Sequence, residues 1–330
     1  MYGAILAVSW AMMNFLSSPR IKGRLVRTLA LAVVAAGMLT GAQGAAADPI
    51  TLGSAGSYGL LLGTNETLTT NGLHVSGDIG LSASNKVNLS GYLTVGGNAY
   101  LDGTPTVSGG GSYSVAGSIV TQSMTAIDAA ANSASTTAGA LAANLTVSGG
   151  AINVNSSTNS IVIKAVQNAS ENVLNISSLS LTNGSITFDD NGYTNAKFII
   201  NVTGAFSMTN AALIKGINGA SADDIIFNIE GTGTTVNLTG NSSTSLIGTI
   251  LAPQRNVNLG GGGNLTGALI AGVKNAGTSY TVNQSGSGYN ITSLGFTPRN
   301  PVNTPEPSTM ALFGAGFSAL IAARRQRRKR

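Results

Sequence analysis

Short clusters of apolar residues alternate with polar residues from residue 50 to residue 296, and Gly, Asn, Ser and Thr separate the clusters. Alternation with a period of two is typical of β-strands, and Gly and Asn favour turns because they adopt positive φ. The pattern therefore predicts a mainly β domain. We expect strands over Ile50–Leu62 (two strands about a turn), Val75–Leu81, Tyr92–Leu101, Val115–Val120, Leu145–Val147, Ala151–Val154, Ile161–Val166, Val173–Ile176, Leu179–Leu181 and Ile186–Phe188.

Two further runs are apolar almost throughout, KFIINV (Lys197–Val202) and DIIFNIE (Asp224–Glu230). A strand without alternation is usually buried on both of its faces. We therefore expect these two strands to be covered on each side by other elements.

Two segments in the second half of the chain repeat. Val236–Leu238 (VNL) returns as Val257–Leu259, 21 residues later, and Leu246–Ala252 returns as Leu265–Ala271, 19 residues later. A period of roughly 20 with short strands and Gly or Asn corners is typical of a β-solenoid, whose coils bury their apolar faces against one another. We predict a right-handed β-solenoid, with an antiparallel β-sandwich as the alternative.

One segment interrupts the strand pattern. Thr121–Ala143 is rich in alanine, and Met124, Ile127, Ala131 and Leu141 form an apolar stripe along it. Alanine has the highest helix propensity, and an apolar stripe lets a helix pack on a core. We predict one helix, over residues 122–133.

The N-terminus has the features of a secretory signal peptide, over residues 1–47. Four basic residues between Arg20 and Arg27 precede the apolar run Thr28–Leu39, and the small residues Ala45 and Ala47 then provide a cleavage site. The apolar run is too short for a permanent membrane span. An apolar stretch precedes the basic region, so residues 1–12 are either a wrongly assigned start, with Met12 or Met13 as the true start, or a long first region.

The C-terminus has three parts in a fixed order. Pro305, Glu306 and Pro307 form an extended segment, because the prolines disfavour both helix and strand. A 15-residue apolar segment, 309–323, follows and predicts a short transmembrane helix. The chain ends in a basic tail that should stay on the cytoplasmic side of the membrane. This tail comprises Arg324, Arg325, Arg327, Arg328, Lys329 and Arg330.

Residues 305–330 resemble the PEP-CTERM sorting signal of Gram-negative bacteria. The resemblance implies cleavage near Pro305–Pro307 by a membrane protease of the exosortase type. An ordinary short tail anchor is the alternative. Residues 297–304 then form a linker to the β domain, 48–296.

Composition narrows the choice of function. The chain carries a net charge of +5, but residues 48–307 contain seven basic and twelve acidic residues, so the basic character belongs to the two targeting segments. It is no argument for nucleic acid binding, and we expect no nucleic acid partner. The chain has no cysteine, so an exported body must fold without disulfides.

Several segments resemble the choice-of-anchor A domain, a bacterial surface domain found upstream of C-terminal anchors. They are Leu93–Ala99, Phe198–Gly204, Ile225–Asn228, Gly248–Pro253 and Asn264–Ala271. That family carries no established catalytic residues. Leu52–Tyr58 and Val75–Leu81 are also similar to ice-binding-like solenoid proteins. Thr67/Thr69, Thr104/Thr106 and Thr232/Thr234 are the candidates for a threonine ladder, and their uneven spacing argues against one.

Candidate chemistry is sparse. His74 is the only histidine, so a metal site or a Ser/His pair lacks partners, and we expect a solvated or capping role. Asp189–Asp190 and Asp223–Asp224 lack the ligand spacing of a calcium loop and are interpreted as turns. Asp128 is expected to be solvated. We predict no catalytic, metal or cofactor site and no cofactor.

We therefore predict a non-catalytic structural or adhesive protein of the cell surface or extracellular matrix. Its expected partners are signal peptidase, an exosortase-type protease and an exopolysaccharide, with the membrane as an intermediate location before release to the outer surface. A solenoid that binds a glycan or ice is the alternative. A polysaccharide-cleaving enzyme is the third hypothesis and would use carboxylates drawn from Asp78, Asp102, Asp189 and Asp223.

Overall fold

The computed structural model describes residues 50–166, 171–193, 196–274, 278–286, 288–294 and 296. The predicted signal peptide, the linker 297–304 and the segment 305–330 lie outside the described residues. Asp48–Asn300 forms one compact unit. Within the described ranges, no helix combines the length and the apolar character that crossing a bilayer requires.

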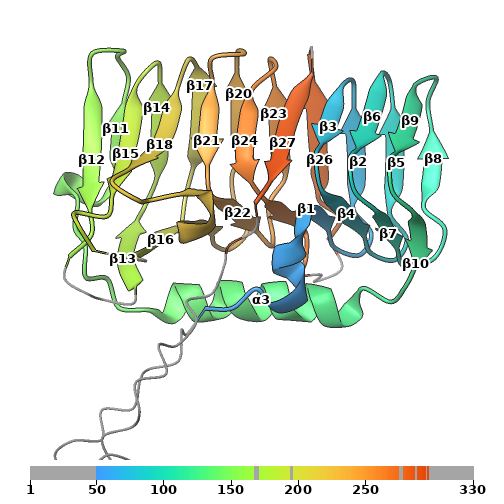
Figure 1. Ribbon diagram of the computed structural model, residues 1–330, viewed down its shortest axis with the longest axis horizontal. Coiled ribbons are helices and arrows are strands. Elements are labelled where there is room, and N and C mark those ends of the chain that lie inside the picture. Colours follow the sequence, from blue (N-terminus) through green and yellow to red (C-terminus); the bar gives the residue numbers. More distant parts are fainter. Residues whose placement is uncertain are drawn as a thin grey trace, which may run out of the picture. The chain divides into compact units, whose positions relative to one another are not determined.

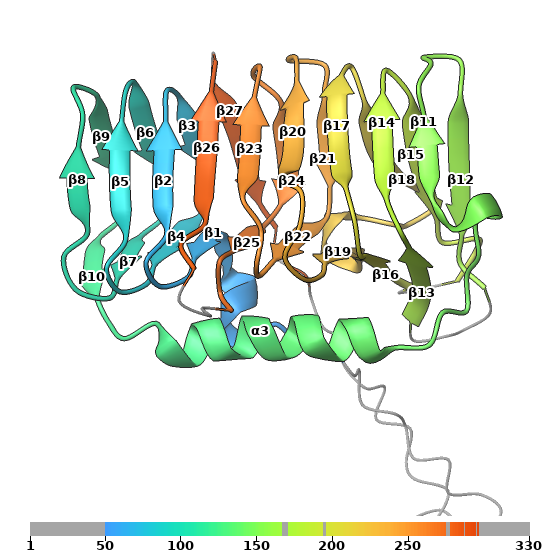
Figure 2. The ribbon, with the colours of Figure 1, turned by 180° about the vertical axis from the view of Figure 1, so that it is seen from behind.

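The described strands form three parallel sheets of nine strands each, wound as a β-solenoid (Figures 1 and 2). Parallel pairing throughout confirms the solenoid and contradicts the antiparallel sandwich. The first sheet, sheet A, contains in spatial order β10 (Ile119–Thr121), β7 (Ala99–Leu101), β4 (Asp78–Leu81), β1 (Tyr58–Leu62), β25 (Leu269–Ala271), β22 (Thr249–Ala252), β19 (Ile225–Ile229), β16 (Lys197–Val202) and β13 (Glu171–Ile176).

The other two sheets follow the same order along the solenoid. Sheet B contains β11 (Ile152–Val154), β14 (Leu179–Thr182), β17 (Phe206–Asn210), β20 (Val236–Gly240), β23 (Val257–Gly260), β26 (Thr281–Ser285), β2 (Thr67–Thr70), β5 (Lys86–Leu89) and β8 (Thr106–Ser108). Sheet C contains β12 (Ser160–Lys164), β15 (Ser185–Asp189), β18 (Leu213–Ile217), β21 (Ser245–Ile247), β24 (Asn264–Gly267), β27 (Tyr289–Ser293), β3 (Leu73–Val75), β6 (Tyr92–Val95) and β9 (Ser112–Val115).

The repeats seen in the sequence stack in register. Val236 pairs with Val257, Leu246 with Leu265, and Ile250 with Leu269. Each repeat places an apolar residue on the inside of the coil, directly above the corresponding residue of the next coil. The columns of Leu, Ile, Val and Phe that result form the main core.

The order of the coils in space differs from their order in the chain. β1 to β10 lead away from the middle of the solenoid to one end, and the helix α3 (Thr125–Ala140) then runs back along the molecule (Figure 1). β11 to β27 return from the other end, and β25, β26 and β27 stack on β1, β2 and β3. This junction, the seam, joins residues more than 200 positions apart, such as Thr67 and Thr281.

Two local predictions need correction. The first part of Ile50–Leu62 is a 3-10 turn, η1 (Gly53–Ser57), because Gly53 adopts a positive φ of 51° and interrupts extended backbone. The predicted helix over 122–133 is present but begins at Thr125 and continues to Ala140. Two other short 3-10 turns are η2 (Ser148–Gly150) and η3 (Ala222–Asp224).

Sheet A is buried on both faces, as the runs in β16 and β19 predicted. Its outward residues Ile199, Ile226 and Leu251 pack with Ile127 and other residues of α3 in a second core. The helix therefore covers this sheet along much of its length (Figure 2).

A ladder of asparagines attaches the C-terminal half of α3 to sheet A. Asn228 donates to Asn201 Oδ1 (2.9 Å), and Asn201 donates to Asn175 Oδ1 (2.9 Å). Asn201 also donates to the carbonyl of Ala138, and Asn228 to that of Ser135. The ladder thus satisfies helix carbonyls that would otherwise lack partners in a dry interface.

The ladder yields a prediction of stability. Replacing the buried Asn201 with alanine leaves the carbonyl of Ala138 and the amide of Asn228 each with one partner fewer, so we expect a loss of about 1–3 kcal/mol in the free energy of unfolding. Asn283→Ala, at a half-exposed position of sheet B, should change it by less than about 0.5 kcal/mol. Urea denaturation of residues 48–300 measures both, and equal effects would contradict a structural role for the ladder.

Candidate functional site

Sheet B presents the most regular open surface of the solenoid. α3 covers sheet A, and the outward residues of sheet C are mixed, including Val162, Lys215 and the exposed Ile217. Sheet B lies free on its outer side (Figure 2). Among its nine strands, Lys86 is the single charged residue.

Every strand of sheet B contributes the middle residue of an apolar–polar–apolar triplet to one outward row. The flanking apolar side chains point into the core, so strand geometry directs the middle side chain outward. Printed pairings align these middle residues from coil to coil. In spatial order, the polar row comprises Asn153, Ser180, Ser207, Asn237, Asn258, Asn283, Thr69, Asn88 and Ser108.

The polar row is accessible and regular. All nine side chains are exposed or half-exposed. At the spacing of paired strands, about 4.8 Å, the row extends for roughly 38 Å. Asn258 donates to Asn237 Oδ1 (3.1 Å), which holds two neighbouring amides in a common orientation.

A shorter row of threonines runs beside the polar row. Thr182 pairs with Thr209 and Thr209 with Thr239, and the hydroxyls of Thr182 and Thr209 are hydrogen-bonded at 3.0 Å. Hydroxyl and amide side chains each offer both donors and acceptors. The face can therefore form many hydrogen bonds with a ligand that also carries both.

Glu66 fixes the seam where it crosses sheet B. Its backbone N–H donates to Asn85 Oδ1 (2.8 Å), and its carboxylate Oε2 accepts the backbone N–H of Tyr280, the residue before β26. The side chain is 1% exposed, and Oε1 has no hydrogen-bond partner among the described residues. Burial raises the pKa of Glu66 to about 8, so the carboxyl is protonated at neutral pH.

The acidic residues considered in the sequence serve as hydrogen-bond acceptors. Asp78 accepts from the backbone of Asn98, Asp102 from that of Met124, and Asp189 from that of Asn191. Asp224 forms a buried ion pair with Lys197 at 2.7 Å and, with Ser221, caps η3. In the part of the chain that the structure describes, no three potential metal-ligating side chains of His, Asp or Glu come together.

Two expectations about single residues have different outcomes. Asp128 is buried, accepts a hydrogen bond from Ser82 Oγ (2.9 Å) and has its pKa raised to about 6 by burial, so the expectation of a solvated residue was wrong. It lies on the side of α3 that faces the solenoid. His74 is half-buried in sheet C between Thr94 and Asn290, in an outward position as expected for a solvated residue.

The predicted targeting residues are not part of this geometry. Ala45, Ala47, Pro305, Glu306, Pro307 and the basic tail lie outside the described residues. Of the threonine candidates, Thr67 and Thr69 of β2 and Thr106 of β8 do enter sheet B, whereas Thr232 and Thr234 lie between strands. The ladder exists, but asparagine and serine contribute most of it.

Fold and face define a parallel β-solenoid with a helix on one sheet and an open polar row on another. A family model described as "Putative Ice-binding-like adhesive domain" matches residues 33–298, and the chain belongs to this family. A second model, the PEP-CTERM protein-sorting motif, matches residues 303–328 and confirms that resemblance. The resemblance to choice-of-anchor A domains stays a resemblance. Family and motif together fit an exported surface adhesive protein.

Solved structures with a similar fold include ice-binding proteins from several organisms. A glycosylated protein from an Arctic yeast is 16% identical, with 77% of this chain and 97% of that chain covered and a TM-score of 0.49. For Antarctomyces psychrotrophicus the values are 15%, 74%, 98% and 0.48, and for a Shewanella frigidimarina domain 18%, 73%, 97% and 0.46. A search of the curated proteins finds no match.

The protonation of Glu66 predicts how stability depends on pH. The folded chain holds the proton up to a pH of about 8, whereas the unfolded chain releases it near 4.5, so the free energy of unfolding should fall as pH rises between these values. We expect a decrease of up to about 3 kcal/mol between pH 6 and pH 8. Glu66→Gln, which cannot ionise, should remove most of this decrease.

Urea denaturation of residues 48–300 at several pH values tests this. Asp128 and Asp190, whose pKa values are both raised to about 6, should still make both proteins more stable near pH 4 than near pH 6. A pH dependence above 6 that is identical in the two proteins would show that Glu66 is not its source.

Proposed function

We propose that this chain is an exported surface protein that adheres through the outer face of sheet B to a hydroxyl-rich polymer, such as an exopolysaccharide. The observation that supports the proposal is the polar row, in which nine neighbouring strands present Asn, Ser or Thr at the same position. Sugar hydroxyls donate and accept hydrogen bonds, as these side chains do.

The size of the row compensates for weak individual contacts. A hydrogen bond at a wet surface contributes little net free energy, on the order of 1 kcal/mol. A polymer that lies along the row forms many such contacts at once, and each one increases the effective concentration for the next. Lys86 is the one charge on these strands, so adhesion through the face should depend only weakly on salt.

The ends of the chain supply the route to the surface. In this proposal signal peptidase cleaves after Ala47, and the segment 309–323 holds the chain in the inner membrane of a Gram-negative cell. An exosortase-type protease then cleaves near Pro305–Pro307 and releases the body to the outer surface or the matrix. The body acts without catalysis.

Ice is the second candidate for the ligand. The family description and the names of the similar solved structures refer to ice binding. A regular row of amides and hydroxyls can also order water molecules at the strand spacing. Ice recrystallisation assays with residues 48–300 distinguish the two candidates, since a polymer adhesin leaves crystal growth unchanged.

Substitutions in the row test the adhesive face. The triple variant Asn237→Ala, Asn258→Ala, Asn283→Ala removes three adjacent amides from the centre of sheet B. We expect its binding to immobilised exopolysaccharide of the host to fall about tenfold or more, because neighbouring contacts are lost together.

Sheet C provides the matched control. Asn264 and Asn290 pair across β24 and β27 with an amide hydrogen bond of 3.1 Å, and Thr94 lies two coils further on the same row. Replacing these three residues with alanine should leave binding within about twofold of the unmodified protein. Equal losses in the two triple variants would contradict the assignment of the face.

Processing gives a separate prediction. The intact mass of the mature protein from its host should correspond to a chain that begins near Asp48 and ends near Pro305–Pro307. Replacing Pro305, Glu306 and Pro307 together with alanine should leave an uncut chain in the inner membrane, because the recognition segment is gone. A protein released from that variant with the same mass would exclude this cleavage site.

A further inference from the structure

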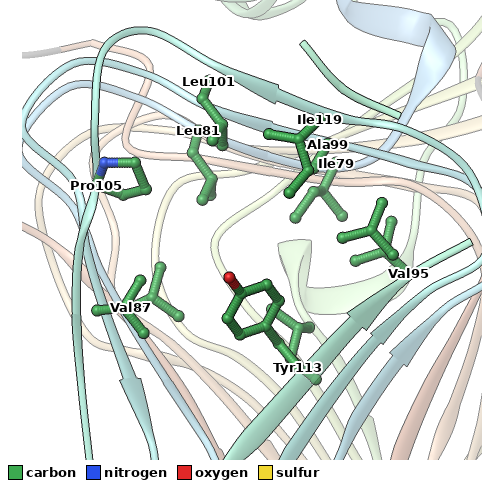
Figure 3. A pocket seen from close by; sticks show the side chains of 12 residues that line it. Ile79, Leu81, Val87, Val95, Ala99, Leu101, Pro105, Tyr113 and Ile119 are labelled. Carbon is green, nitrogen blue, oxygen red and sulfur yellow. The ribbon is translucent and has the colours of Figure 1, made fainter. Parts of the chain in front are cut away.

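One end of the solenoid is open. β10, β8 and β9 are the terminal strands of sheets A, B and C at the same end, so each has an unpaired edge there. Between these strands lies an apolar cavity of about 90 Å³ (Figure 3), lined by Ile79, Leu81, Val87, Leu93, Val95, Ala99, Leu101, Pro105, Val107, Tyr113, Val115 and Ile119.

The last coil exposes side chains that belong to the core of every other coil. Val107 occupies the inward position that Val87 and Leu68 fill in neighbouring coils, yet it is 51% exposed. Tyr113 and Ile119 are 58% and 57% exposed. Solenoids normally carry a polar terminal repeat that covers this surface, and the open end has none.

The opposite end is covered. Leu145 forms a bridge with Leu174 on the free edge of β13, and its backbone N–H donates to the carbonyl of Val173 (2.9 Å). Leu145 and Val147 pack against the core. A copy of the chain that tried to stack its open end on this end would meet an occupied edge, so head-to-tail growth is blocked.

We propose that two copies of this chain associate open end to open end. The end is compatible with itself electrostatically, because Asp102 is the single charged residue in Ala99–Thr121 and its carboxylate already accepts the N–H of Met124. Edge strands without charged side chains readily pair with another chain. The same apolar surface is buried on both copies, as in a closed two-fold dimer.

The size of the surface sets the strength. An end made of three short strands and a few large apolar side chains buries less than the roughly 1,200–2,000 Å² of a standard interface. The dimer should therefore be reversible, with a dissociation constant on the order of micromolar. This association does not depend on which ligand sheet B binds.

Sedimentation equilibrium of residues 48–300 over about 1 to 100 µM tests the proposal. We expect a monomer–dimer equilibrium, which Ile119→Asp should weaken by more than about tenfold, because a buried unpaired charge is costly. Val162→Asp, at an equally exposed apolar position of β12 near the covered end, should leave the equilibrium unchanged. Circular dichroism and the thermal midpoint verify that both variants are folded.

Engineered cysteines locate the contact, since the chain has none of its own. Ser112→Cys, exposed at the start of β9, should form dimers with a flexible thiol cross-linker, and Ser160→Cys, exposed at the start of β12, should not. A monomer at all concentrations, masses that grow beyond the dimer, or equal cross-linking of both cysteines would overturn the proposal.

Discussion

The stacking of the returning coil on the first coil holds this fold together. β25, β26 and β27 pair in parallel with β1, β2 and β3, and this seam turns two separate stacks of coils into one continuous solenoid. Without it, each stack would expose an apolar cross-section in the middle of the molecule. Its pairing joins residues far apart in the chain, so loop-closure entropy opposes it and register must be specified well.

Buried polar groups provide that specification. The carboxyl of Glu66 packs against Gly272, where a side chain would come within 2.3 Å of its Cδ, and accepts the N–H of Tyr280 from the returning coil. Across the core of the first coil, Thr70 donates to Gln284 Oε1 at 3.1 Å. On the far side of sheet A, the asparagine ladder fixes α3 at the length needed to carry the chain back. A shift of one residue would leave these groups without partners.

The sequence was sufficient for the sheets but not for their order. The apolar–polar–apolar triplets and the repeat of 19 to 21 residues predict parallel coils, because both periods are local. The seam depends on pairing between β2 and β26, which no local pattern reveals. The polar row was visible in part, since Asn237 and Asn258 stand at the centre of the recognised repeat VNL. A search for threonine alone missed the serines and asparagines, and Asp128 was misjudged because its burial depends on the position of α3 against Ser82.

Two surfaces of one scaffold thus support separate roles, an outer face for adhesion and an end for association. The most direct test of the central claim is an NMR titration of residues 48–300 with the exopolysaccharide of the host, observing the side-chain amides. We predict that the signals of Asn237, Asn258 and Asn283 on sheet B shift, while those of Asn264 and Asn290 on sheet C stay in place. Shifts confined to sheet C, or no shifts at saturating polymer, would contradict adhesion through the polar row.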